Sequence, residues 1–396
     1  TTGDGNTALG RESMRLNTTG GANVAIGNEA LEENTTASNN VAIGVHCMGA
    51  NTTGSNNVAM GRGAFDVNTT GANCVAIGYE ALDANTTADD NTAVGYQALS
   101  ANTTAAGNTA VGKHALKVCE TSTGHAAFGY LALSAVTTGN NNTALGYNAG
   151  AAITTGGQNV AIGTLSLDAN TAGGDNIAIG HQALTTLTTN DGNIAIGRDS
   201  LSTLSNETGN TAVGHKTLED TTAGHNTAIG YAAGRENTSG QDNTVIGSQA
   251  FDANTTGSDN TAVGRNALGA NTTASNNTAV GNSALLSNTT GDNNTAVGSG
   301  ALDANTTRFN NTAIGYRALT NQSVADQNTA VGADAMFTNT EGEYNVAVGF
   351  MALYNNTTAD VNTGIGYQAL LNNTTGSNNT AVGGNALDAT TTGSNN

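Results

Sequence analysis

The phrase Asn-Thr-Ala-aliphatic-Gly returns along the whole chain at an almost constant interval. Its closing glycine occurs 23 times, from Gly10 to Gly383. Every interval is 17 residues, except for 16 residues between Gly214 and Gly230. Self-similarity at a fixed period is typical of repeat architectures, in which equivalent residues occupy equivalent environments. We therefore expect a single continuous array over residues 1–396, with no separate domain or linker.

The repeat reads NTAVGxxALxxNTTGxN, and we number its positions 1 to 17 from the first asparagine. Position 4 is apolar in every copy, and position 8 is always small. Position 9 is Leu, Met or Phe except at Gly150 and Gly234. The apolar residues form two short clusters, TAVG and AL, which do not follow the 3.6-residue spacing of a helix. Asn and Gly between them favour tight turns, and Thr favours strands.

This pattern predicts an all-β fold: a parallel β-solenoid of 23 coils. We expect two short strands per repeat, near positions 1–5 and 6–10, and a turn over positions 11–17. Coils stacked in register about 4.8 Å apart would form a rod on the order of 110 Å long. The alternative is the triangular left-handed β-helix of hexapeptide-repeat proteins, whose hexad IGYQAL (365–370) fits, but only one hexad per repeat does so.

The first predicted strand is apolar or small on both faces. Positions 2 and 4 point one way, and the Ala of position 3 and the Gly of position 5 point the other way. A thin coil made of one chain would expose one of these faces to water. Two apolar faces indicate that one lines the interior and the other contacts a second copy of the chain. We therefore expect a homo-oligomer.

Several phrases resemble repeats of known fibrous proteins. NNVAIG (39–44), NCVAIG (73–78) and QNVAIG (158–163) resemble the head repeats of trimeric autotransporter adhesins, and NTAVGYQALSANTT (91–104) resembles repeat arrays of phage tail fibres. The resemblance implies a left-handed parallel β-roll, a homotrimer, and an extracellular place at a cell surface or on a virion fibre. It implies a structural or adhesive shaft. Because the chain starts and stops within a repeat, we expect a segment of a longer fibre.

Position 12 is the asparagine of an NTT triplet in twelve copies: Asn17, Asn34, Asn51, Asn68, Asn85, Asn102, Asn254, Asn271, Asn288, Asn305, Asn356 and Asn373. NTT is also an acceptor sequence for N-glycosylation. Other copies carry Cys119, Val136, Ile153, Leu187 or Leu204 at this position. We therefore expect position 12 to face inward, with its amides in a structural ladder. If it faced outward, the apolar members would form an exposed patch for a partner.

Position 6 carries many aromatic and basic residues, including Tyr79, Tyr96, Tyr130, Tyr147, Tyr231, Tyr316 and Tyr367. On a solenoid these residues fall on one line. We interpret this line as a surface ladder of stacked rings and cation–π contacts that stiffens the fold. The alternative is a binding face for a surface glycan or a receptor, because Tyr and Arg are favoured in recognition.

Composition and motifs exclude several other functions. A net charge of −19 disfavours nucleic-acid binding, and no apolar run is long enough for insertion into a membrane. The sequence contains no nucleophile elbow, CxxC pair or recurring metal-ligand spacing, so we predict no enzyme, no cofactor and no metal. Cys47, Cys74 and Cys119 are too far apart along the predicted stack to form disulfides. A filament that assembles end to end is a further alternative for the function.

Overall fold

The computed structural model describes residues 2–396, and within this range it contains 23 strands and no helix. Each strand is three residues long and covers positions 2–4 of one repeat. The chain forms two compact units, Thr1–Ala195 and Ile196–Asn396, and the boundary between them falls inside β12 (Ile194–Ile196). None of the described residues belongs to a helix that could cross a membrane.

The strands of the first unit are β1 (Thr7–Leu9), β2 (Val24–Ile26), β3 (Val41–Ile43), β4 (Val58–Met60), β5 (Val75–Ile77), β6 (Thr92–Val94), β7 (Thr109–Val111), β8 (Ala126–Phe128), β9 (Thr143–Leu145), β10 (Val160–Ile162) and β11 (Ile177–Ile179). The strands of the second unit are β13 (Thr211–Val213), β14 (Thr227–Ile229), β15 (Thr244–Ile246), β16 (Thr261–Val263), β17 (Thr278–Val280), β18 (Thr295–Val297), β19 (Thr312–Ile314), β20 (Thr329–Val331), β21 (Val346–Val348), β22 (Thr363–Ile365) and β23 (Thr380–Val382).

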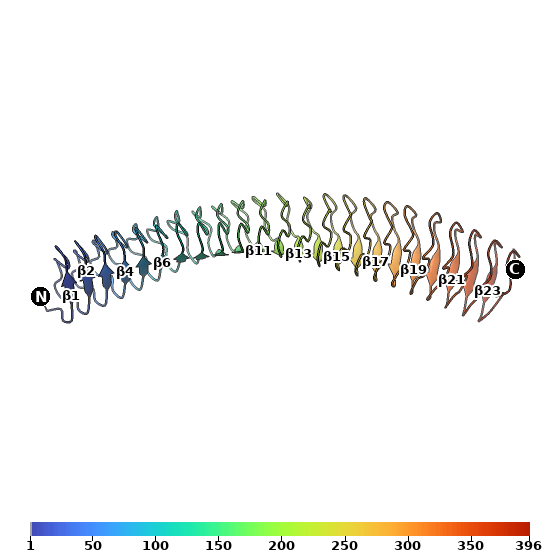
Figure 1. Cartoon of the computed structure of the whole chain (residues 1–396), viewed down its shortest axis with the longest axis horizontal. Helices are drawn as coiled ribbons and strands as arrows, with labels where there is room; N and C mark the ends of the chain where they lie inside the picture. Colours follow the sequence, from blue (N-terminus) through green and yellow to red (C-terminus); the bar gives the residue numbers. More distant parts are fainter. Residues whose placement is uncertain (1) are drawn as a thin grey trace. The chain divides into compact units, whose positions relative to one another are not determined.

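Within each unit, consecutive strands pair in parallel and line up along the stacked coils (Figure 1). The register joins equivalent positions of neighbouring repeats, as in the pairs Val24↔Val41 and Ala25↔Ala42. One 17-residue repeat therefore makes one turn of the solenoid. The predicted all-β parallel solenoid is confirmed.

The second predicted strand, at positions 6–10, is wrong. This segment is a turn, because positions 7 and 9 have a left-handed backbone, as in Glu29 (φ 56°) and Leu31 (φ 54°). A strand requires a strongly negative φ at every residue. The turn is still tied to its neighbours: the N–H of Glu29 donates to the carbonyl of Arg11 in the preceding coil, and that of Leu31 to Cys47 in the following coil. The stack is thus held by a turn ladder as well as by the sheet.

The interior of each coil is lined by small and aliphatic side chains from three positions. In the coil of β2, Ala25 (position 3), Ala30 (position 8) and Leu31 (position 9) are all fully buried. The side chains of positions 2 and 4 lie on the outer face of the sheet and remain half-buried or exposed, as Val24 and Ile26 illustrate. Of the two apolar faces of the strand, it is therefore the alanine face that lines the interior.

The single 16-residue repeat keeps the strand register unchanged, since Thr211 pairs with Thr227 and Val213 with Ile229. The N–H and the hydroxyl of Thr222 both donate to the carbonyl of Thr238, which is the bonding pattern of position 13 in other coils. The omitted residue is therefore position 14, a solvent-exposed position elsewhere. The omission shortens the outer loop and leaves the interior ladders in place.

Candidate functional site

The asparagines of position 12 form a ladder inside the solenoid. In a representative coil, Asn34 Nδ2 donates to Asn17 Oδ1 of the preceding coil at 2.8 Å and to the carbonyl of Ala37 at 3.1 Å. The other residues predicted for this ladder are fully buried, while Asn17 is partly buried. A buried amide is stable only when its donors and acceptors are satisfied, and stacking in register satisfies most of them. The Oδ1 atoms of Asn102, Asn305 and Asn373 have no hydrogen-bond partner, because the next coil carries a residue other than Asn at position 12.

The apolar residues of position 12 are also inside. Cys119, Val136, Ile153, Leu187 and Leu204 each have an exposed fraction of 0%. An exposed partner-binding patch at this position, the alternative considered from the sequence, is therefore wrong. These residues replace stretches of the amide ladder with aliphatic packing.

A second asparagine ladder, at position 1, was missed by the sequence analysis. The backbone N–H of Asn40 donates to Asn23 Oδ1 at 2.9 Å, and Asn23 Nδ2 donates to the carbonyl of Ala37 at 2.9 Å. The carbonyl of position 15 thus receives amide hydrogens from both ladders, since Asn34 donates to Ala37 as well. The signal was present in the sequence, because position 1 is Asn in every repeat except at Cys74 and His125.

His125 replaces the position-1 asparagine in a coil that also lacks the position-12 asparagine. Its backbone N–H donates to Asn108 Oδ1, and its Nδ1 accepts the N–H of Asn142 at 3.2 Å. Its Nε2 lies 3.1 Å from Ser122 Oγ, which in turn lies 3.2 Å from Cys119 Sγ. Burial lowers the pKa of His125 to about 4, so the ring is neutral at pH 7 and can accept a hydrogen bond as Asn does.

We expect His125 to make the chain sensitive to acid. As the pH falls from 6.5 to about 4, the unfolded chain binds a proton at His125 that the folded chain does not, so stability decreases. The full loss is roughly 3 kcal/mol for a shift of this size. We therefore expect the difference in stability between His125→Asn and the wild type to shift in favour of the variant between pH 7 and pH 4.5. Thermal unfolding of the full chain at both pH values measures this difference. An unfolding-midpoint difference that is equal at both pH values would contradict this prediction.

The structure brings together four of the seven tyrosines predicted on the position-6 line. Tyr79 and Tyr96 stack with ring centroids 5.1 Å apart, and Tyr130 and Tyr147 with centroids 5.3 Å apart. Lys113 Nζ lies between the pairs, 5.6 Å from the Tyr96 ring and 5.9 Å from the Tyr130 ring. In each pair, one face of each ring is therefore covered by the ring of the neighbouring coil.

The other three tyrosines of this line have different neighbours. Tyr231 lies beside His215, Tyr316 beside Arg317, and Tyr367 stacks on Phe350. More than half of the Tyr231, Tyr316 and Tyr367 surface is exposed. The line is thus a series of local contacts, within a coil or between adjacent coils, rather than one uniform aromatic surface.

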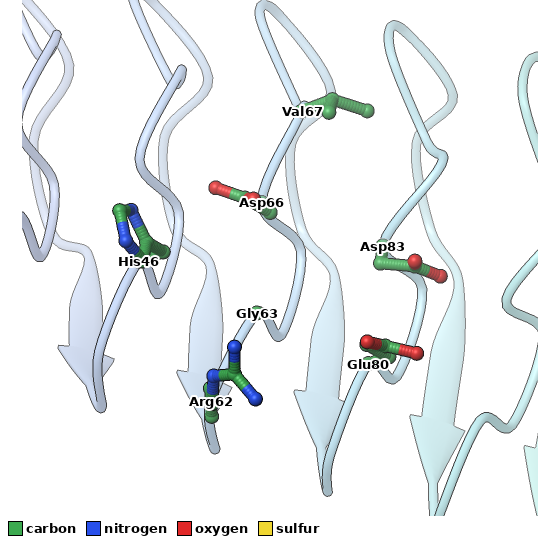
Figure 2. Close-up of a pocket in the computed structure, with 7 residues that line it drawn as sticks. All are labelled: His46, Arg62, Gly63, Asp66, Val67, Glu80 and Asp83. Carbon is green, nitrogen blue, oxygen red and sulfur yellow. The ribbon is translucent and has the colours of Figure 1, made fainter.

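A charged pocket of about 170 Å³ lies on the turns that follow β3, β4 and β5, lined by His46, Arg62, Gly63, Asp66, Val67, Glu80 and Asp83 (Figure 2). It forms at position 7 of the β4 coil, where Gly63 stands between His46 and Glu80 of the neighbouring coils. Because glycine has no side chain, a notch remains between those two residues.

The charged groups of this pocket mostly interact with one another and with adjacent coils. His46 Nδ1 lies 3.0 Å from Glu29 Oε2, and Glu80 accepts a hydrogen bond from Gln97 at 2.8 Å. Burial, aided by repulsion from Glu80, raises the pKa of Asp83 to about 6, and burial also raises the pKa of Asp66. Among residues 2–396, no group of three or more His, Cys, Asp or Glu side chains is placed to hold a metal ion.

All three cysteines are buried and unpaired, which confirms the expected absence of disulfides among them. Burial raises the pKa of Cys47 to about 12 and that of Cys74 to about 11. A thiol reacts as the thiolate, so these side chains are inert packing residues at neutral pH.

The fold and its interior ladders define the class of the molecule as a parallel β-solenoid repeat protein. Compared with models of known families and with curated proteins, the chain matches none of them.

Proposed function

We propose that the chain is a structural shaft segment of an extracellular fibre, which holds other parts of that fibre away from a cell surface or virion. The observation that carries this proposal is the continuity of bonding inside each unit. Neighbouring coils are joined by strand pairs, by turn hydrogen bonds and by interior polar side chains, most of which are asparagines. A repeat stack of this kind resists local opening, because each coil is stabilised by its neighbours.

The remaining surface features favour this mechanical role over recognition or catalysis. In the tyrosine pairs of position 6, each ring packs one face on its partner, and that face is not available for stacking on a sugar. The buried cysteines and His125 are enclosed in the interior, where no substrate reaches them. A glycan- or receptor-binding module is therefore the weaker proposal.

We further propose that the shaft is built from several copies of this chain. The supporting observation is a stripe of outward side chains at positions 2 and 4 that follows the sheet in each unit; it is apolar at position 4 in every strand and Val, Ile, Ala or Thr at position 2. It contains Val24, Ile26, Val41 and Ile43 in the first unit, and Ile246 and Ile314 are 39% and 41% exposed in the second. A contiguous exposed apolar surface of this kind marks a protein interface. The resemblance to adhesin heads suggests three chains around one axis.

The stripe predicts that charge placed on it separates the chains. We expect the wild type to sediment as a homo-oligomer, and the double variant Ile246→Lys/Ile314→Lys to sediment as a monomer with an unchanged circular dichroism spectrum. The control Thr256→Lys/Thr290→Lys, at exposed position 14, should remain oligomeric. Sedimentation equilibrium measures all three. A wild type that is monomeric at every concentration would refute this assembly, and particles that lengthen with concentration would favour end-to-end filaments instead.

A further inference from the structure

The acceptor sequences for N-glycosylation fall into a buried group and an exposed group. The buried group comprises the twelve NTT asparagines of position 12 and Asn237 in an NTS triplet. All are fully buried except Asn17, which is partly buried. The second group lies on the outside of the coils. It comprises the NNT triplets whose exposed acceptor is at position 17: Asn141, Asn276, Asn293, Asn310 and Asn378. It also includes Asn206 (NET), Asn321 (NQS) and Asn372 (NNT), which are exposed, and the half-buried Asn355 (NNT). The same modification therefore has opposite structural consequences in the two groups.

The space around a position-12 amide is already filled. In the β4 coil, Asn68 Nδ2 donates to Asn51 Oδ1 at 2.7 Å and to the carbonyl of Gly71 at 3.0 Å. Even a methyl group added at Gly54 would lie 2.7 Å from Asn51 Oδ1 and 2.9 Å from Asn68 Nδ2. A site that cannot accept one carbon atom cannot accept a sugar.

We propose that N-glycosylation at position 12 blocks folding, so this chain forms its solenoid only where these asparagines escape an oligosaccharyltransferase before they are buried. The transferase joins C1 of an oligosaccharide to Asn Nδ2 and breaks the bond from C1 to the pyrophosphate of a lipid-linked donor. The Nδ2 atom loses one hydrogen as a proton. A modified position-12 amide thus loses one of its two hydrogen bonds and carries a bulky hydrophilic group at an interior position.

The exposed group contains the asparagines that can carry a glycan in the folded chain. Position 17 lies at the outer loop, where Asn141, Asn276 and Asn310 are exposed. A glycan there points into solvent and leaves both interior ladders intact. Glycosylation at position 17 is therefore compatible with the same fold that position-12 glycosylation prevents.

The third residue of each buried acceptor sequence offers a test that leaves the ladder asparagine unchanged. It is the exposed residue of position 14: Thr19, Thr36, Thr53, Thr70, Thr87, Thr104, Ser239, Thr256, Thr273, Thr290, Thr307, Thr358 and Thr375. Substituting these thirteen residues with Ala abolishes the acceptors, and exposed substitutions have little effect on stability. The matched control removes only the position-17 acceptors, through Thr143→Ala, Thr278→Ala, Thr295→Ala, Thr312→Ala and Thr380→Ala.

Both variants and the full wild-type chain are directed into the secretory pathway of a eukaryotic cell behind a signal peptide. We expect the wild type and the control to be glycosylated at position 12 and retained as misfolded protein. The thirteen-residue variant should be secreted as a β-solenoid with glycans only at the acceptors outside position 12. Treating cells that express the wild type with an inhibitor of lipid-linked oligosaccharide synthesis should restore its secretion.

Secreted, protease-resistant wild type whose position-12 asparagines carry glycans, as detected by mass spectrometry, would overturn the proposal. The proposal would also fail if the inhibitor did not restore secretion of the wild type, because the retention would then have a cause other than glycans. The inhibitor arm keeps the test decisive even if the thirteen-residue variant folds poorly.

Discussion

Gly298→Ala is expected to promote local unfolding of the coil that contains it, with a loss of about 3–5 kcal/mol in local stability. Gly298 lies at position 5, directly after the end of strand β18, and its φ is 140°. A Cβ atom here would overlap the carbonyl oxygen of Gly315 in the next coil. The backbone must separate to relieve this overlap, which weakens the ladder bond from Gly298 N to Val280 O and that from Gly315 N to Val297 O.

Gly300→Asn is a matched control two residues away. Gly300 also has a positive φ, of 67°, but it lies at position 7, and the nearest atom to an added Cβ is the flexible Arg317 Cγ at 3.6 Å. Equivalent positions hold Asn148 and Asn266, so asparagine suits this backbone. Hydrogen exchange followed by mass spectrometry should show rapid exchange of residues 295–315 in the alanine variant and not in the control. Equal protection in both variants would disprove the packing argument.

Asn243→Ala is expected to destabilise the second unit by about 3 kcal/mol, through an unpaired backbone group and a small cavity. Asn243 belongs to the position-1 ladder. Its Oδ1 accepts the backbone N–H of Asn260 at 3.0 Å, and its Nδ2 donates to the carbonyl of Gly257 at 3.0 Å. Gly257 keeps a second donor in Asn254, whereas alanine gives the Asn260 N–H no replacement acceptor. The largest effect should therefore appear at Asn260.

Two further variants separate the lost acceptor from a general effect of substitution. Thr256→Ala, at an exposed position, should change stability by less than about 0.5 kcal/mol. Asn243→Asp keeps an acceptor for Asn260 but buries a charge, so it should be less stable than Asn243→Ala at pH 7 and recover as the pH falls. Thermal unfolding and hydrogen exchange of residues 243–264 report these differences. A neutral alanine variant would mean that the position-1 ladder contributes nothing.

The sequence predicted most of the residues that are buried inside the solenoid, but it did not predict the backbone conformation between the strands. Leu187 and Leu204 indicated that the side chains of position 12 face the interior, and both are buried. The second strand was mispredicted because the short apolar cluster Ala-Leu at positions 8 and 9 was interpreted as part of a strand. Ala30 and Leu31 are adjacent and both fully buried, which a strand does not allow, since its side chains alternate between faces. That adjacency was the overlooked signal.

The sequence by itself determined the period, the class of fold and the residues that pack inside, because strict recurrence forces each position into one environment. Only the tertiary structure decided how the polar interior is satisfied, because the hydrogen bonds of Asn34 and Asn40 reach the preceding coil. It also decided which strand face is left outside, since that depends on which way the chain closes each turn. A local pattern specifies what a residue prefers, and the stacked neighbours specify what it contacts.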